Sequence, residues 1–326
     1  MAKEKLPVIP FELQPKSADF DFDIDRALAG VVGLKAIVPE NAFTAKTLGT
    51  ERMGHGVVIR QTGLVLTMGY LVVEAETIWL RTIDGRTIQG HTLAFDQETG
   101  FGLVQAMSSL DLPVLPFGES RTVEPGDRVI VAGAGGRELA LAAQVVARQE
   151  FAGYWEYLLD EAFYTARAHP FWGGAAVIDE GGKLIGLASL QVEQGQRGKK
   201  NSTSLNMVVP IDIVKPSLGD LVKYGRPNRP ARPWLGLYAT ELGERIVIAG
   251  VADGGPAEKA GIDTGDILLA IEDERPKSLA DLWRRIWSLG PAGVEVSVLV
   301  EREGRIVATK IRSADRLAFT RAPVLH

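Results

Sequence analysis

The chain contains no cysteine, and it has only four histidines among its 326 residues. The lack of cysteine excludes disulfide bonds, thiolate catalysis and thiolate metal sites. The histidines, His55, His91, His169 and His326, are too widely spaced to form a local metal motif. The glycine-rich run at 133–136 is not followed by a lysine or a helix start, so it does not predict a phosphate loop. We therefore expect neither a metal ion nor a cofactor.

Long apolar runs and basic clusters are also missing. No segment of about 18 consecutive apolar residues occurs, so no membrane span is predicted. Residues 1–30 lack the basic head and apolar run of a secretory signal, so the chain as given is expected in the cytoplasm. An extracytoplasmic location would require a trimmed N-terminus. The net charge of -5 arises from interspersed charges of both signs, and nucleic acid is therefore not expected as a partner.

Glycine and proline, in contrast, are abundant, with 36 and 17 residues, as is typical of a β-rich and turn-dense chain. Residues 1–30 are polar and acidic and predict an extended N-terminal arm. Its Phe11, Phe20 and Phe22 either anchor on another surface or belong to a loosely packed end. Residues 31–222 contain many short apolar segments separated by turn signals, a pattern that predicts a β-sandwich or β-barrel.

A second domain follows a proline-rich stretch, "KYGRPNRPARPWLG", in which residues 223–232 are predicted to be a linker. Residues 233–314 show an α+β pattern of strands, a short helix that stops at Gly261, and an amphipathic helix with Ser278 as its N-cap. Residues 315–326 remain as a C-terminal tail.

The order of these segments resembles the HtrA (Deg) family of serine proteases. The stretches "GPAEKAGIDTGDILLAIEDERPKSLADL" and "NMVVPIDIVKP" carry the likeness, which covers residues 31–314. The resemblance implies a mostly β fold in which a chymotrypsin-like double β-barrel, also described as trypsin-like, precedes an α+β PDZ domain. It also implies a homo-oligomer, because family members commonly form trimers through the protease domain and its N-terminal segment.

The family's catalytic positions are occupied by other residues. In "LTMGYLVV" the position of the base holds Tyr70, in "FDQETGFGLVQA" the orienting aspartate is replaced by Gly100, and in "HPFWGGAAV" the nucleophile is replaced by Trp172. A phenol holds its proton at neutral pH, glycine has no side chain, and an indole cannot attack a carbonyl. Pro170, at an oxyanion-hole position, has no N–H to donate. The sequence therefore predicts a pseudoenzyme with a serine endopeptidase fold.

Two alternatives stay open. One is a serine-type hydrolase with relocated catalytic residues, for which the candidates are His55, His91, His169, Ser108, Ser109, Thr67 and Asp96. The other is a sensor in which the former cleft has become a ligand pocket around Tyr70 and Trp172.

The predicted PDZ domain supplies the favoured function, binding of a protein or peptide C-terminus as an added strand. The resemblance implies a carboxylate-binding loop and a groove helix, with the candidate residues Trp234, Leu235, Gly236, Leu237, Leu282, Trp283 and Ile286. The tryptophan pair at 283 and 287 is expected to face a partner or to pack on the barrel. The sequence thus predicts an inactive HtrA-like protein that acts as a peptide-binding or scaffold protein.

Overall fold

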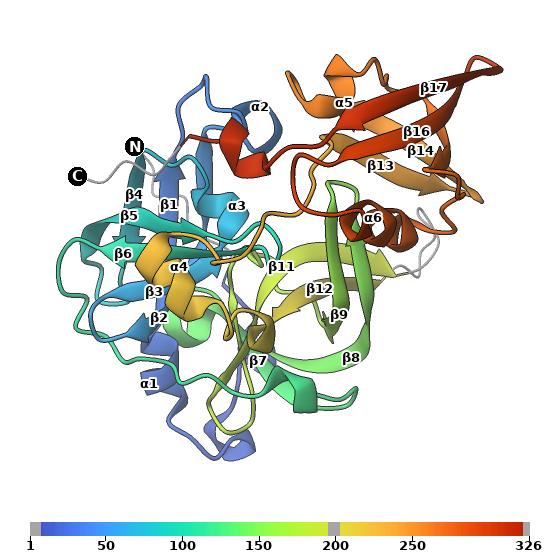
Figure 1. Ribbon diagram of the computed structural model, residues 1–326. Helices are drawn as coiled ribbons and strands as arrows, with labels where there is room; N and C mark the ends of the chain where they lie inside the picture. The colour runs from blue at the N-terminus through green and yellow to red at the C-terminus, as the bar shows by residue number, and fades with distance from the viewer. Residues whose placement is uncertain (1–7, 195–202, 322–326) are drawn as a thin grey trace. The chain divides into compact units, whose positions relative to one another are not determined.

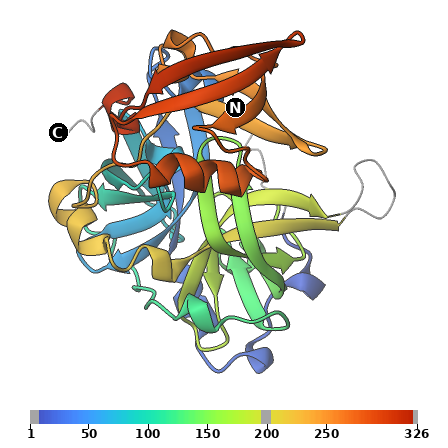
Figure 2. The ribbon, with the colours of Figure 1, turned by 45° about the vertical axis from the view of Figure 1, so that its right-hand side comes forward.

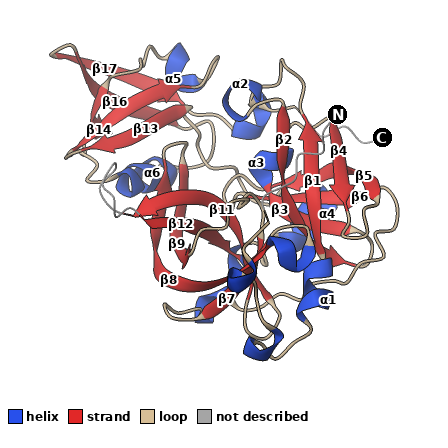
Figure 3. Ribbon diagram, turned by 180° about the vertical axis from the view of Figure 1, so that it is seen from behind, coloured by secondary structure: helices blue, strands red, loops and turns tan. Residues whose placement is uncertain are grey.

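The computed structural model describes residues 8–194 and 203–321, which form two compact units dominated by strands (Figure 3). The first unit contains the described residues up to 149 and from 161 to 228. The second unit combines Glu150–Asp160 with Arg229–Arg321. None of the helices in the described ranges is long and apolar enough to cross a membrane.

The first unit begins with a closed six-stranded antiparallel barrel in the order β1-β2-β3-β6-β5-β4 (Figure 1). Its strands are β1 (Val31–Ile37), β2 (Glu51–Arg60), β3 (Leu64–Met68), β4 (Thr77–Arg81), β5 (Thr87–Phe95) and β6 (Phe101–Ala106). Side chains along β5 alternate between buried and more exposed, as the period of a strand requires, whereas β3 is buried throughout. Two short helices, α2 (Ala45–Leu48) and α3 (Gly69–Val72), interrupt the barrel connections.

A second closed barrel follows in the order β10-β11-β12-β9-β8-β7. Its strands are β7 (Arg128–Ala132), β8 (Ala140–Gly153), β9 (Tyr157–Ala166), β10 (Ala176–Ile178), β11 (Leu184–Gln194) and β12 (Thr203–Pro210). The long strands β8 and β9 form a hairpin (Figure 2). Short 3-10 segments lie before, within and after this barrel: η3 (Ser120–Thr122) precedes β7, η4 (Gly136–Leu139) connects β7 to β8, and η5 (Ile211–Ile213) follows β12. The expected double β-barrel is therefore confirmed.

The N-terminal segment differs from the extended arm that the sequence predicted. It contains two 3-10 segments, η1 (Phe11–Leu13) and η2 (Ser17–Asp19), and the helix α1 (Ile24–Ala29). Phe20 is buried and Phe11 is exposed. Arg137 on η4 fastens the segment, because its guanidinium donates to the carboxylate of Asp25 (2.6 and 2.9 Å). The prediction overlooked this packing because it depends on side chains more than 100 residues apart in the sequence.

The second unit contains a five-stranded antiparallel sheet, β13 to β17 in chain order, and two helices. The strands are β13 (Leu237–Leu242), β14 (Arg245–Val251), β15 (Ile267–Ile271), β16 (Glu295–Arg302) and β17 (Arg305–Arg312), and the helices are α5 (Pro256–Lys259) and α6 (Leu279–Ser288). Ser278 caps α6, since its hydroxyl accepts from the N–H of Asp281 (3.1 Å). The expected α+β architecture is confirmed.

The unit boundaries are wider than the predicted ones. Helix α4 (Leu218–Tyr224) extends into the expected linker, and it ends at Gly225, whose positive φ of 73° suits a helix end. A 3-10 segment of the expected tail, η6 (Arg316–Phe319), belongs to the second unit, where Phe319 packs on Trp234 with ring centroids 4.9 Å apart. The largest difference from the predicted boundaries is Glu150–Asp160. This segment of the β8–β9 hairpin belongs to the second unit, although the sequence predicted it in the first domain.

Candidate functional site

The three positions that the resemblance assigns to the triad lie close together in the first unit. Tyr70 lies on α3, and its neighbour Gly69 donates an N–H to the carbonyl of Gly100 (2.7 Å). A methyl group added to Gly173 would come within 3.2 Å of the Tyr70 hydroxyl. Because Trp172 precedes Gly173, the fold brings all three positions into one region.

The side chains at these positions have little capacity for acyl-transfer chemistry. Burial raises the pKa of the Tyr70 phenol above its ordinary value, and the hydroxyl donates to the main-chain carbonyl of Ser189 (3.1 Å). Gly100 has no side chain, and the half-buried Trp172 packs against the core of the second barrel. Pro170 is exposed and has no N–H. None of these groups is a nucleophile or a general base at neutral pH.

His169, at the start of the same loop, is fully buried and fully hydrogen-bonded. Its ring Nδ1 accepts from the N–H of Phe171 (3.1 Å), and its Nε2 lies 3.0 Å from the carbonyl oxygen of Leu139. Its main-chain N–H donates to Oδ1 of Asn206 (2.6 Å). Since backbone groups occupy both ring nitrogens, this histidine has a structural role in the loop.

The second glycine after Trp172 is required by the backbone. Gly174 has a φ of +77°, and a methyl group there would lie 2.2 Å from the carbonyl oxygen of His55. The His55 N–H donates to the carbonyl of Gly173 (2.8 Å), and its carbonyl accepts from the Thr67 hydroxyl (2.6 Å). Gly174 of the "GG" pair therefore has a structural cause that does not depend on catalysis.

The His55 side chain is also buried, and its Nδ1 accepts from the N–H of Ala134 (3.1 Å). Burial, with a smaller effect of the nearby His169, lowers the pKa of His55 to about 4. Burial lowers the pKa of His169 as well. Both rings are therefore neutral at pH 7.

This depressed pKa makes a prediction about acid stability. Because the folded state favours neutral His55, the unfolded chain takes up the proton first as the pH falls below about 6.5, and stability is lost progressively down to about pH 4. Between pH 7 and pH 4 this residue should cost about 3 kcal/mol of unfolding free energy. In His55→Gln the decrease in unfolding free energy between pH 7 and pH 4 should be smaller by about 3 kcal/mol. Urea unfolding at a series of pH values measures this difference. A pH dependence that is the same in His55→Gln as in the unchanged chain would contradict the assignment.

The other candidates for a relocated catalytic site make local contacts. The Ser109 hydroxyl donates to the carboxylate of Asp111 (2.5 Å), and Asp96 accepts from the Thr99 hydroxyl (2.9 Å). His91 lies on β5 opposite Gln105. Ser108 is exposed in the turn after β6. None of these contacts joins a hydroxyl to a histidine ring.

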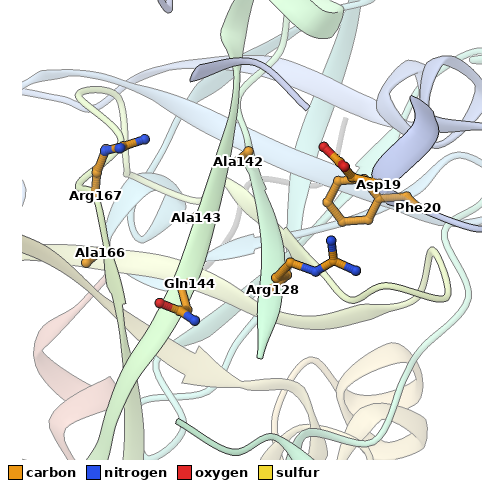
Figure 4. A pocket seen from close by; sticks show the side chains of 8 residues that line it. All are labelled: Asp19, Phe20, Arg128, Ala142, Ala143, Gln144, Ala166 and Arg167. Carbon is orange, nitrogen blue, oxygen red and sulfur yellow. The ribbon is translucent and has the colours of Figure 1, made fainter. Parts of the chain in front are cut away.

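A surface depression of about 470 Å³ lies on the second barrel (Figure 4). Its lining residues come from the N-terminal segment and from β7, β8 and the end of β9: Asp19, Phe20, Arg128, Ala142, Ala143, Gln144, Ala166 and Arg167. It includes neither Tyr70 nor Trp172, so it is not the ligand pocket that the sensor hypothesis expects. Within residues 8–194 and 203–321, no group of three or more His, Cys, Asp or Glu side chains is arranged to hold a metal ion.

The predicted carboxylate-binding loop is present in the second unit, and it already holds a carboxylate. Its N–H groups converge on the side chain of Glu156: Leu235 donates to both oxygens (3.2 and 3.0 Å), and Gly236 (2.6 Å) and Leu237 (2.9 Å) donate to Oε1. The φ of +79° at Gly236 lets consecutive N–H groups point to one side, which creates an anion-binding concavity. Trp234 is different, because its N–H donates to the carbonyl of Ala314 (3.0 Å).

Glu156 is 6% exposed and comes from the Glu150–Asp160 segment of the β8–β9 hairpin. Burial raises its pKa, although the three loop residues and the positive charge of Arg316 act in the opposite direction, and the result is about 7. The neighbouring Tyr154 places its carbonyl 2.9 Å from the N–H of Ala239 on β13. Since β13 is the edge strand of the sheet, the segment occupies the edge to which a peptide would add.

Helix α6 completes this groove. Trp283 is fully buried, and its indole Nε1 donates to the carbonyl of Gly153 (3.0 Å). Leu282 and Ile286 are also fully buried, in a core that includes Leu158 of the same segment. The three predicted groove residues of α6 therefore face the core and the hairpin segment, while Trp287 is half-buried beneath the guanidinium of Arg232.

Comparisons with known proteins agree with the two units. Residues 54–187 match the family described as trypsin-like peptidase domain, and residues 233–312 match the PDZ domain family. The serine protease Do-like HtrA of Bacillus subtilis is 22% identical, over 91% of this chain and 72% of its own length. The serine endoprotease DegS of Haemophilus influenzae is 24% identical, over 80% of this chain and 76% of its own length.

Solved structures show the same fold. The HtrA-type protease AlgW with a decapeptide superposes with a TM-score of 0.53 at 20% identity, and it covers 90% of this chain and 97% of its own. The serine endoprotease from Yersinia pestis gives a TM-score of 0.52 at 22% identity, over 90% of this chain and 96% of its own. At such identities the likeness establishes the arrangement of strands and helices. It does not establish the chemistry, which has to be argued from the residues of this chain.

Proposed function

We propose that this chain, which belongs to the HtrA family, is a member that binds proteins without cleaving them. The observation that carries the proposal is Trp172 at the position of the nucleophile, because an indole cannot form an acyl-enzyme. The other two triad positions, Tyr70 and Gly100, supply neither a base at neutral pH nor an orienting carboxylate. Pro170 removes an N–H that an oxyanion hole would need, a loss that by itself costs about 10²–10³ in rate.

The binding function rests on the groove of the second unit. The N–H groups of Leu235, Gly236 and Leu237 form an anion-binding loop next to the edge strand β13, the two features that hold a C-terminal peptide in a PDZ domain. The partners we propose are therefore protein or peptide C-termini. Self-association into a homo-oligomer, which the resemblance implies, is part of the same proposal as a means of presenting several grooves at once.

Incubation with an unfolded substrate tests the proposal. The purified chain should leave casein intact over hours at 37 °C, while an active trypsin-like protease, added at the same molar concentration as a positive control, degrades it. Cleavage that co-purifies with the chain through successive columns, and that disappears when a single exposed candidate residue such as Ser109 is changed, would overturn the proposal in favour of a relocated catalytic site.

A further inference from the structure

The hairpin segment Tyr154–Glu156 meets the groove as a bound peptide would. In strand addition, a terminal carboxylate is held by the loop N–H groups while the peptide backbone pairs with the edge strand. Here the Glu156 carboxylate accepts the loop N–H groups, and the Tyr154 carbonyl accepts from Ala239, two residues beyond Leu237. Tyr154 precedes Glu156 by two residues, and Ala239 follows Leu237 by two residues. The two segments therefore run in opposite directions in register, as in an antiparallel pair.

An internal segment imitates a chain end here because of the backbone at Glu156. Its φ of +58° is in the left-handed region, where a residue other than glycine is uncommon and strained by about 1–3 kcal/mol. This conformation turns the main chain away toward Tyr157 and leaves the side-chain carboxylate in the loop. The contacts that hold it there offset this strain.

Further contacts hold the segment on both sides of its tip. Leu158 is part of the apolar core of the second unit, and Ala152 packs against that core. At the two ends, Glu150 and Asp160 both pair with Arg284 of α6 (2.5 Å each). Because these ion pairs are exposed, they contribute little to the stability of the docked segment. The burial of Leu158 and the charge-assisted hydrogen bonds of Glu156 contribute more.

We propose that Tyr154–Glu156 is a built-in ligand of the carboxylate-binding loop, so that a partner gains the groove by displacing it with its own C-terminal carboxylate. This inference rests on the proposed peptide-binding function and adds its regulation: the resting groove is closed by the chain itself. A productive partner must supply both a carboxylate for Leu235, Gly236 and Leu237 and a carbonyl for Ala239. Acidic side chains alone, without the strand pairing, would displace the hairpin poorly.

Hydrogen exchange of the full-length chain tests the docking itself. In the unchanged chain the amides of Leu235, Gly236, Leu237 and Ala239 should exchange slowly. At pH 8, where Glu156 with its pKa of about 7 is mostly ionised, Glu156→Gln removes the charge at constant shape and should speed their exchange about tenfold to a hundredfold, the effect expected when a buried charge-assisted acceptor is lost. Glu150→Gln is the matched control, since it changes the same residue type in the same segment at an exposed ion pair with Arg284. Exchange that is slow in both variants would overturn the inference.

Peptide retention separates this inference from the function on which it rests. The probe is a mixture of synthetic heptapeptides with four randomised last residues and a free C-terminal carboxylate, with the same mixture amidated for comparison. Glu156→Gln should retain at least tenfold more of the free peptides than the unchanged chain, and little of the amidated ones. Equal retention by both proteins would overturn the built-in ligand and leave the binding function. Fast exchange in Glu156→Gln without retention of any peptide would overturn the binding function instead.

Discussion

Replacing Trp283 with alanine is expected to destabilise the second unit by about 3–5 kcal/mol, the usual cost of truncating a buried aromatic side chain. The indole is fully buried at the centre of α6, within the core formed with Leu282, Ile286 and Leu158. The substitution also leaves the Gly153 carbonyl without its indole donor. The lost packing and the lost hydrogen bond both lie where α6 contacts the hairpin segment. The substitution should therefore disrupt the groove as well as lower the stability of the unit.

Native-state hydrogen exchange of β16 measures this effect, because Val296, Val298 and Val300 lie in the same core. Trp287→Ala is the matched control: the same residue type lies one helical turn away but is half-buried. It should cost markedly less than Trp283→Ala. Trp283→Phe should fall between them, since it keeps ring packing and loses the hydrogen bond. A similar loss in Trp283→Ala and Trp287→Ala would contradict the packing described here.

Replacing Arg52 with methionine is expected to destabilise the first unit by about 3–5 kcal/mol, because it removes one member of a buried charged network. Arg52 is only 4% exposed, and burial lowers its pKa to about 10, so it remains charged at neutral pH. Its guanidinium donates to the carbonyls of Tyr70 and Val73 (2.9 Å each) and to the Thr44 hydroxyl (2.8 Å). That hydroxyl donates to the buried carboxylate of Glu74 (2.5 Å).

Arg52→Met thus removes a positive charge near Glu74 and the donor to the carbonyls of Tyr70 and Val73, which lie in α3 and at its C-terminal end. Hydrogen exchange of β1 and β2 measures the loss. Lys35→Met provides the comparison, since Lys35 pairs with Glu51 at the surface (2.8 Å), where an ion pair contributes up to about 1 kcal/mol. Arg52→Met with an effect no larger than that of Lys35→Met would show that the network does not hold α3.

Features that depend on neighbouring residues could be predicted from the sequence. The capped start of α6 at Ser278 and the left-handed glycine at Gly261 after α5 were found as expected, because caps and turns are decided within a few residues. The three positions that correspond to the triad could be placed by motif, since each lies next to a strand with a distinctive pattern. Tyr70, Gly100 and Trp172 lie in one region of the structure, and their correspondence to the triad stays a prediction.

The occupant of the groove could not be predicted in this way. Glu156 reaches Leu235, Gly236 and Leu237 across 79 to 81 residues of sequence, and nothing local in "AGYWEYLL" marks this glutamate as a ligand. Its positive φ leaves no trace in the sequence, because residues other than glycine in this conformation have no strong signature. The predicted groove residues of α6, Leu282, Trp283 and Ile286, are buried in the core of the second unit, and the sequence pattern could not distinguish an open groove from a covered surface.

The most direct test of the account is whether the chain contains an activated nucleophile. Intact mass spectrometry after incubation with a fluorophosphonate probe, which forms an adduct with an activated serine, measures this in one step. We predict that the chain keeps its unmodified mass under conditions that label an active trypsin-like protease completely, because we propose that Trp172 occupies the position of the nucleophile. A stoichiometric adduct, mapped to one serine or threonine of the first unit, would contradict the account and identify a relocated catalytic residue.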